Sequence, residues 1–116
     1  MNKAERLRSI LELMKDFVDG NISAKNFERK YMLIWNYIRD KSLYYSHKIQ
    51  TILDELFTDV DTFESNNKLL KELRKEMKED GYTIKQINKM YTDEEGLKKY
   101  VKAKLKKLTS VLKKKK

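Results

Sequence analysis

The chain contains no cysteine, no proline and only three glycines among its 116 residues. The lack of cysteine excludes a disulfide framework and a thiolate metal site, and it is typical of a reducing compartment. Many short strands and tight turns would need more glycine and proline, whereas lysine, glutamate and leucine, which favour helices, are abundant. The composition therefore predicts an all-α protein.

Long apolar runs are also missing. No run approaches the roughly 18 residues of a membrane-spanning helix, and charge interrupts the N-terminal stretch MNKAERLRSILELMKD too often for a signal peptide. We therefore expect a cytoplasmic protein without a membrane segment. With 40% apolar residues, the length suits one domain with one core, placed at residues 1–112, followed by a basic, frayed end at 113–116.

Motifs of catalysis and metal binding do not occur. The single histidine, His47, lacks a cysteine or a second histidine as partner, so we interpret it as a surface or boundary residue. There is no glycine-rich phosphate loop and no zinc-protease or hydrolase motif. Asp59 and Asp61 resemble the opening of a calcium loop, but Phe63 and Glu64 stand where that loop needs an oxygen ligand and a glycine. We expect no enzymatic activity, no cofactor and no metal.

Charge is abundant and unevenly distributed. The net charge is +9 from 27 basic and 18 acidic residues, but residues 96–116 hold ten lysines and no acid. Residues 1–95 therefore keep 17 basic and 18 acidic groups and are almost neutral. The segment 49–67 has no lysine or arginine and contains five acids, which are Asp54, Glu55, Asp59, Asp61 and Glu64. A strongly acidic segment thus lies within a chain that is basic overall.

Hydrophobic periodicity indicates a first helix that ends near Val18, before Gly20 at a position that favours left-handed backbone. Ser23 is expected to cap a second helix, with Tyr31 and Trp35 in its buried stripe. A third helix has its own apolar stripe and is closed by the acidic turn. That stripe consists of Ile49, Ile52, Leu53, Leu56 and Phe57.

The second half of the chain predicts a helical stretch before Gly81, a short helix, and a long last helix with Leu97, Val101, Leu105, Leu108 and Leu112 on one side. Two capping boxes, Thr83 with Gln86 and Thr92 with Glu95, are expected to open the short helix and the last helix. These elements favour an antiparallel bundle of four main helices plus a short extra helix.

The acids of the segment 49–67 have two interpretations. Asp54 and Glu55 lie off the apolar stripe of the third helix, so their carboxylates are expected to face solvent, ready for a partner. Asp61 and Glu64 have the spacing of a capping box, and local capping is as good an explanation of Asp61 as contact with a partner. Val60 and Phe63 are expected to hold the turn against the core.

Three pieces of the sequence, in order, resemble the colicin D immunity family: DGNISAKNFERKY, LFTDVDTF and DEEGLKKYV. The resemblance covers most of the chain. It implies a helical bundle that binds the nuclease domain of a cognate toxin, often a tRNA-cleaving one, and blocks its active site by mimicking phosphates. Because a nuclease cleft is lined with lysine and arginine, the blocking surface should be acidic. The residues expected to form it are Asp54, Glu55, Asp59, Asp61 and Glu64.

Two features depart from the family pattern. The stretch 69–89 looks longer than a minimal member needs, and the lysine-rich end is the opposite of phosphate mimicry. An alternative function therefore stays open, namely a small helical nucleic-acid-binding or regulatory protein whose basic last helix contacts phosphates. A scaffold role is a third possibility.

Overall fold

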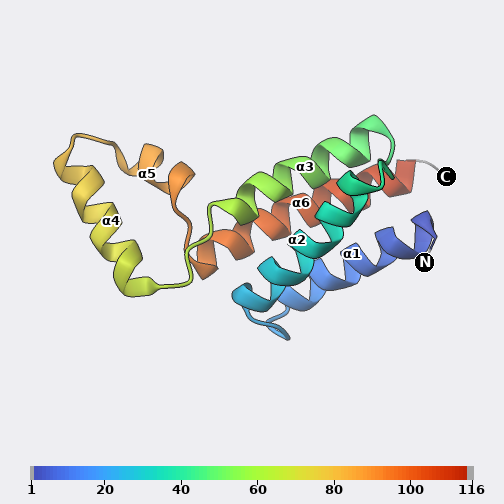
Figure 1. The fold of residues 1–116 in the computed structure, drawn as a ribbon, viewed down its shortest axis with the longest axis horizontal. Coiled ribbons are helices and arrows are strands. Elements are labelled where there is room, and N and C mark those ends of the chain that lie inside the picture. The colour runs from blue at the N-terminus through green and yellow to red at the C-terminus, as the bar shows by residue number, and fades with distance from the viewer. Residues whose placement is uncertain (1, 115–116) are drawn as a thin grey trace.

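The computed structural model describes residues 2–114 and contains six α-helices in that range (Figure 1). Their bounds are α1 Lys3–Val18, α2 Ala24–Asp40, α3 His47–Asp61, α4 Asn67–Glu79, α5 Ile84–Met90 and α6 Glu94–Lys114. The described residues form no β-strand, only an isolated bridge between Phe63 and Thr92. The prediction of an all-α protein is confirmed.

Four helices, α1, α2, α3 and α6, share one apolar core. Its buried residues are Ile10, Leu13, Met14 and Phe17 of α1, Ala24, Phe27, Tyr31 and Ile38 of α2, Ile49, Ile52, Leu53, Leu56 and Val60 of α3, and Leu97, Val101 and Leu108 of α6. Inside this core the Tyr31 hydroxyl donates a hydrogen bond of 2.6 Å to the carbonyl oxygen of Leu53 and links α2 to α3. Burial raises the pKa of Tyr31 well above its ordinary value, so the hydroxyl stays protonated as this bond requires.

Most of the expected helix ends are confirmed. Gly20 follows the C-cap of α1 with φ of +82°, and the Ser23 hydroxyl accepts a hydrogen bond of 3.2 Å from the amide of Asn26. Thr83 and Gln86 form the predicted capping box of α5. These ends are local features, so the sequence suffices to predict them.

The predicted capping box of Thr92 and Glu95 is wrong. Thr92 is buried between α5 and α6, and its hydroxyl lies against Thr62 and the carbonyl of Asn88. The cap of α6 is instead Asp93, whose Oδ1 accepts a hydrogen bond of 2.8 Å from the amide of Gly96. Tertiary contacts therefore decide between two neighbouring capping residues.

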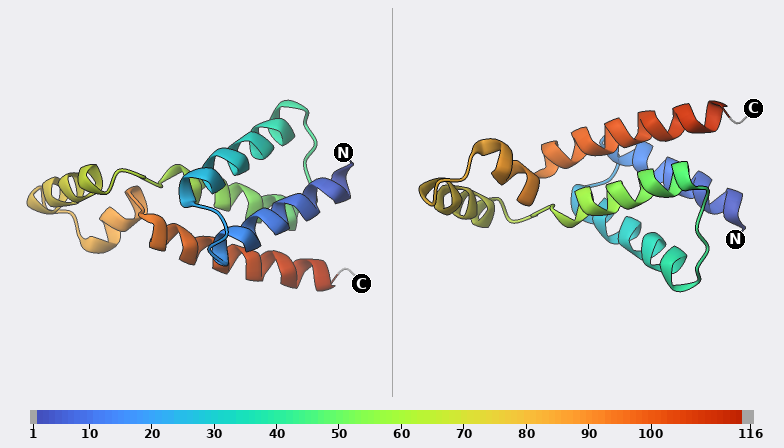
Figure 2. Two further views of the ribbon diagram at one scale, coloured as in Figure 1. Left: turned by 90° about the horizontal axis from the view of Figure 1, so that it is seen from below. Right: turned by 90° about the horizontal axis from the view of Figure 1, so that it is seen from above.

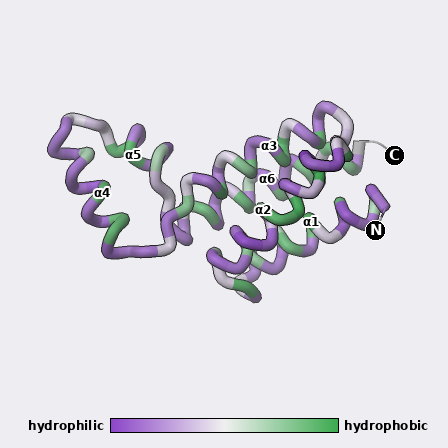
Figure 3. The backbone as a smooth tube through the Cα atoms, in the orientation of Figure 1, coloured by the Kyte–Doolittle hydropathy of each residue, from purple (hydrophilic) through white to green (hydrophobic). Residues whose placement is uncertain are grey.

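Helices α4 and α5 form an arm that stands apart from the other four helices (Figures 1 and 2). Within residues 2–114, the two arm helices pack on one another and on no other helix. Leu70 and Ile87 are the buried apolar residues of the arm. The expectation of one short extra helix is thus corrected to two helices. Most residues of α4 are hydrophilic (Figure 3). The apolar stripe of this helix is therefore too narrow for a place in the main core.

The arm joins the main body through a neck formed by Thr62, Phe63, Glu64 and Thr92. The amide of Thr92 donates to the carbonyl of Thr62 over 2.8 Å, and the amide of Glu64 donates to the carbonyl of Thr92 over 2.9 Å. The hydroxyls of Thr62 and Thr92 lie 2.9 Å apart. Val60 is buried and Phe63 packs on the core, as expected of the apolar pair at this turn. The neck returns the chain to the end of α3, so that α6 runs beside α3.

Helix α6 continues through Lys114, beyond the expected boundary at residue 112, and residues 115 and 116 lie outside the described range. The division into one domain and a frayed end stays a prediction, as does the antiparallel bundle order. Among the described residues, no helix has the length and hydrophobicity required to cross a membrane.

The neck makes Gly96 essential, because a Cβ at this position would lie 2.8 Å from Cγ2 of Thr92. Alanine ordinarily favours a helix interior over glycine by about 1 kcal/mol. We expect Gly96→Ala to lower the free energy of unfolding instead, by about 1 to 2 kcal/mol, since the Cβ would overlap the methyl of the buried Thr92. Urea unfolding followed by circular dichroism measures this change.

The matched background for this prediction is Thr92→Ser, which removes the clashing methyl and keeps the hydroxyl that faces Thr62. In this background Gly96→Ala should cost clearly less or become stabilising, as a double-mutant cycle reports. Equal costs in both backgrounds would show that the close approach to Thr92 is not the reason for glycine.

Candidate functional site

The acidic segment is largely helical and does not form a separate turn. Four of its five acids lie within α3, which ends at Asp61, and only Glu64 lies in the connection that follows. At 100° per residue, Asp54 and Asp61 occupy one side of α3, two turns apart, while Glu55 and Asp59 occupy another. Helix α3 therefore divides its four acids between two faces of the molecule.

Glu55 and Asp59 face α6, where both pair with one cation, Lys104. The Lys104 ammonium lies 3.2 Å from Oδ2 of Asp59 and 3.9 Å from Oε2 of Glu55, and only 12% of the lysine side chain is exposed. Burial raises the pKa of Asp59, and the charge of Lys104 offsets only part of this effect. The expectation that Glu55 faces solvent holds, since its side chain is 47% exposed, but its charge has an internal partner.

Asp54 lies on the side of α3 that faces α2. Its Oδ1 accepts hydrogen bonds of 3.1 Å from the indole Nε1 of Trp35 and of 2.8 Å from the side-chain amide of Gln50. The Trp35 ring stacks on Phe57 with ring centroids 4.0 Å apart, and the Arg39 guanidinium lies 5.3 Å from the centroid of the Trp35 ring. Trp35 was expected in the core, but it is half-buried at the edge of the core, where its N–H can reach Asp54.

Asp61 and Glu64 lie close enough to Glu28 of α2 to affect its ionisation. Burial raises the pKa of Glu28, the negative charges of Glu64 and Asp61 raise it further, and Lys25 lowers it by a smaller amount. Three carboxylates from two helices and a connection therefore share one region. Their mutual repulsion lowers the stability of the folded protein.

The capping interpretation of Asp61 is wrong. Helix α4 begins after Asn66, whose Oδ1 accepts a hydrogen bond of 3.1 Å from the amide of Leu69. Asp61 is exposed at the C-terminal end of α3, and the last turn of α3 contains no basic residue. The partial negative charge of a helix C-terminus disfavours an acid by about 0.3 to 1 kcal/mol. The stability of α3 therefore does not explain why an aspartate stands at position 61.

We define the acidic face as Glu28, Asp54, Asp61 and Glu64, together with the stacked rings of Trp35 and Phe57 beside Asp54. Within residues 2–114, no lysine or arginine nitrogen lies within ion-pair distance of these four carboxylates. The same range contains no group of three or more histidine, cysteine or carboxylate side chains placed to hold a metal. The face therefore has the chemistry of a binding surface for a basic partner.

Comparison with known proteins identifies a family for this chain. The family model for bacterial self-protective colicin-like immunity matches residues 6–108. The chain belongs to this family. The resemblance noted in the sequence is thereby confirmed at the level of the colicin-like immunity family. No curated protein and no solved structure matches the chain.

The structure of this colicin-like immunity family member adds Glu28 to the residues that the sequence suggested. In the sequence, Glu28 lies on the wet side of the second helix among Lys25, Arg29 and Lys30, so nothing separates it from an ordinary solvated charge. Only the packing of α2 on α3 brings it to Asp61 and Glu64. Lys104 was missed for the same reason, because it is one of ten lysines in the last helix region.

Lys104→Met tests the internal neutralisation in this family member, since methionine keeps the packing volume and removes the charge. We expect the free energy of unfolding at pH 7 to fall by about 1 to 3 kcal/mol, because Asp59 is left charged and partly buried. The folded state raises the pKa of Asp59, so the folded chain binds a proton more readily than the unfolded chain. The loss relative to wild type should therefore shrink as the pH falls through that raised pKa.

Thermal and urea unfolding between pH 4 and pH 7 measure both effects. Lys102→Met, which removes an exposed lysine of the same helix, is the control and should change stability by less than about 0.5 kcal/mol. A loss for Lys104→Met that stays constant over this pH range would contradict the pairing with Asp59.

Proposed function

We infer that this member of the colicin-like immunity family protects its cell by binding the nuclease domain of a cognate toxin and inhibiting it. The acidic face occupies the basic cleft that holds the phosphates of the toxin's substrate. A tRNA-cleaving toxin is the type of target that the resemblance suggests. The protein acts by binding alone and in the cytoplasm, where such a toxin would reach its substrate.

The observation that carries this proposal is the gathering of Glu28, Asp61 and Glu64 without an ion-pair partner among the described residues, since the nearby Lys25 offsets only part of their repulsion. In the free protein these carboxylates repel one another, and Asp61 also opposes the dipole of α3. Lysine and arginine side chains of a nuclease cleft would relieve both costs. Residues that oppose local stability are often kept for function, and this cluster fits that pattern.

The centre of the acidic face supports the same proposal. Trp35 and Phe57 form a rigid aromatic pair whose rings are only partly covered, and tryptophan is the residue type most enriched at the energetic centres of interfaces. Two hydrogen bonds fix the Asp54 carboxylate beside this pair. A fixed carboxylate loses little conformational entropy when a partner binds.

The five acids expected to contact the toxin take different roles in this proposal. Asp54, Asp61 and Glu64 contact the toxin together with Glu28, while Glu55 and Asp59 are engaged by Lys104 on the other side of α3. Long-range attraction from the whole acidic segment still accelerates association, because steering depends on the field and not on contact.

Charge reversal at the acidic face provides the test. The double variant Asp61→Lys with Glu64→Lys should lose protection when co-expressed at a limiting level with the nuclease domain of the toxin encoded beside it. Its inhibition constant against that domain should rise by at least about a hundredfold, since desolvated charge pairs are worth about 2 to 5 kcal/mol each. Host survival and cleavage of substrate RNA by the purified domain are the readouts.

The control is Glu12→Lys with Asp16→Lys on α1, which changes the net charge equally at two exposed positions. This variant should protect like wild type, except for a modest decrease in association rate at low salt. Full protection by the Asp61 and Glu64 variant, or equal loss in both variants, would contradict the proposal. If the reversal unfolds the chain, Asp61→Asn with Glu64→Gln replaces it and should weaken inhibition in the same direction.

A further inference from the structure

The outer face of α6 carries a row of lysines that the inhibition of a toxin does not use. Lys99, Lys102, Lys106 and Lys113 are all exposed and are spaced by three, four and seven residues, so they lie on one side of the helix. We call this row the lysine ridge. At a rise of 1.5 Å per residue it is about 21 Å long. From residue 96 to the end of the helix no acid interrupts it.

The contrast with α4 shows that the lysine ridge is not a usual solvated helix surface. Helix α4 also has four exposed lysines, but three glutamates lie among them at helical spacing. Such pairs stabilise a helix, whereas like charges three or four residues apart destabilise it by similar amounts. Repulsion between the lysines of the ridge therefore destabilises α6 in the free protein, whereas the glutamates of α4 prevent such repulsion there.

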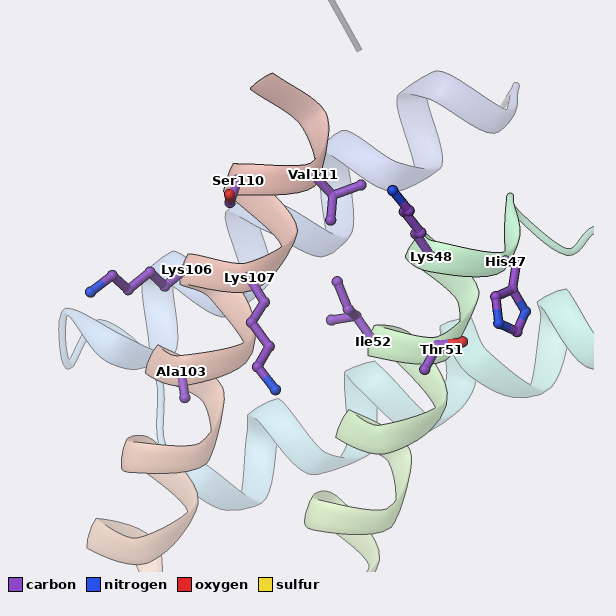
Figure 4. Close-up of a pocket in the computed structure, with 9 residues that line it drawn as sticks. All are labelled: His47, Lys48, Thr51, Ile52, Ala103, Lys106, Lys107, Ser110 and Val111. Carbon is purple, nitrogen blue, oxygen red and sulfur yellow. The ribbon is translucent and has the colours of Figure 1, made fainter. Parts of the chain in front are cut away.

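A groove of 760 Å³ between α3 and α6 adjoins the ridge (Figure 4). Lys48 of α3 and Lys107 of α6 extend into the space between the two helices, whereas Lys106 points outward to the ridge (Figure 4). Ile52 and Val111 lie at its floor. In the described part of the chain, none of these three lysines has a carboxylate within ion-pair distance. Glu55 and Asp59, the acids of α3 on this side, are paired with Lys104.

The chemistry of this surface selects one class of partner. A protein partner would need a cluster of aromatic or aliphatic anchors, whereas the ridge positions are lysines and the groove offers only Ile52, Ala103 and Val111 among its polar and charged side chains. A membrane would need the apolar side of α6, which is buried against the core. Single-stranded nucleic acid binds through aromatic stacking. No phenylalanine, tyrosine or tryptophan lines the groove or the hollow between Lys106 and Lys113, and the nearby tyrosines, Tyr91 and Tyr100, line a hollow with Lys99 at one end of the ridge only. A row of cations suffices for the phosphates of a double helix, whose bases are already stacked.

We propose that the lysine ridge and the adjoining groove bind the phosphate backbone of double-helical nucleic acid. The ammonium groups of the ridge neutralise phosphates along one strand, and Lys48 and Lys107 add two contacts across the groove. The hydroxyls of Thr109 and Ser110 line a shallow hollow between Lys106 and Lys113, where they can donate hydrogen bonds to phosphate oxygens.

This activity is separate from the proposed inhibition of a toxin. The acidic face occupies the α2 side of α3, and the groove occupies its α6 side, so the two surfaces do not overlap. The negative charges of the acidic face repel phosphates and confine nucleic acid to the α6 side. The same chain can therefore hold a basic protein on one face and a polyanion on another.

The test is a titration of a fluorescein-labelled 20-base-pair duplex, as DNA and as RNA, followed by anisotropy between 50 and 300 mM KCl. In the ridge variant, Lys99, Lys102, Lys106 and Lys113 are replaced by glutamine, which keeps helix propensity. We expect its affinity at 50 mM KCl to fall by at least about 30-fold and the slope of log K against log salt to decrease in magnitude by about 3 to 4.

The control variant replaces Lys68, Lys71, Lys75 and Lys78 of α4 by glutamine, with the same change in net charge, and should stay within about threefold of wild type. Arginine at the four ridge positions should retain binding. The proposal is overturned if wild type does not bind at 50 mM KCl, if both glutamine variants weaken equally, or if a 20-nucleotide poly(U) strand binds more tightly than the duplex. If the wild-type protein binds phosphatidylserine vesicles as tightly as the duplex, and the ridge variant loses this binding, the surface would be assigned to membranes instead.

Discussion

The hydrogen bonds between Thr62 and Thr92 determine how the two halves of this chain meet. They lie within a half-buried neck, and they bring residues that are 30 positions apart into backbone contact. Closing so long a loop has an entropic cost, which is offset where the closure allows further contacts to form. Here it places α6 along α3, so that Leu97, Val101 and Leu108 complete the core and Lys104 reaches Asp59. Without the neck, α6 would have no fixed register against α3.

That register also decides the distribution of charge on the surface. Lys104 lies within ion-pair distance of both acids on one side of α3, whereas the acids on the other side have no ion-pair partner within the described chain. Lys48 and Lys107 of the neighbouring groove have no ion-pair partner in the described chain, because the two acids on this side of α3 are paired with Lys104. One internal pair thus separates a negative surface from a positive one across the width of one helix.

Helix periodicity and short-range caps were sufficient to predict the helical class, the ends of α1 and α5, and the cap of α2. Each of these depends on residues within about four positions of one another. The capping patterns at Asp61 and Thr92 failed because the same spacing occurs wherever acids and threonines flank a helix. In both places a neighbouring residue, Asn66 or Asp93, supplies the cap.

The candidate site was only partly predictable for a related reason. Its position in the acidic segment could be expected from local charge, but the separation of Asp54 from Glu55 depends on which helices flank α3. Glu28 enters the site across the α2–α3 packing, and the place of Trp35 at the edge of the core depends on its bond to Asp54. None of these relations is local in the sequence.

The hydrogen bond between Trp35 and Asp54 has a consequence for observing the molecule. Trp35 is the only tryptophan in the chain, and it lies half-buried in the acidic face with its N–H bonded to a carboxylate. The wavelength at which an indole emits depends on the water and charge around it. All the intrinsic tryptophan fluorescence of this protein therefore originates at the surface proposed to meet the toxin, and it reports directly whether that surface is wet or covered.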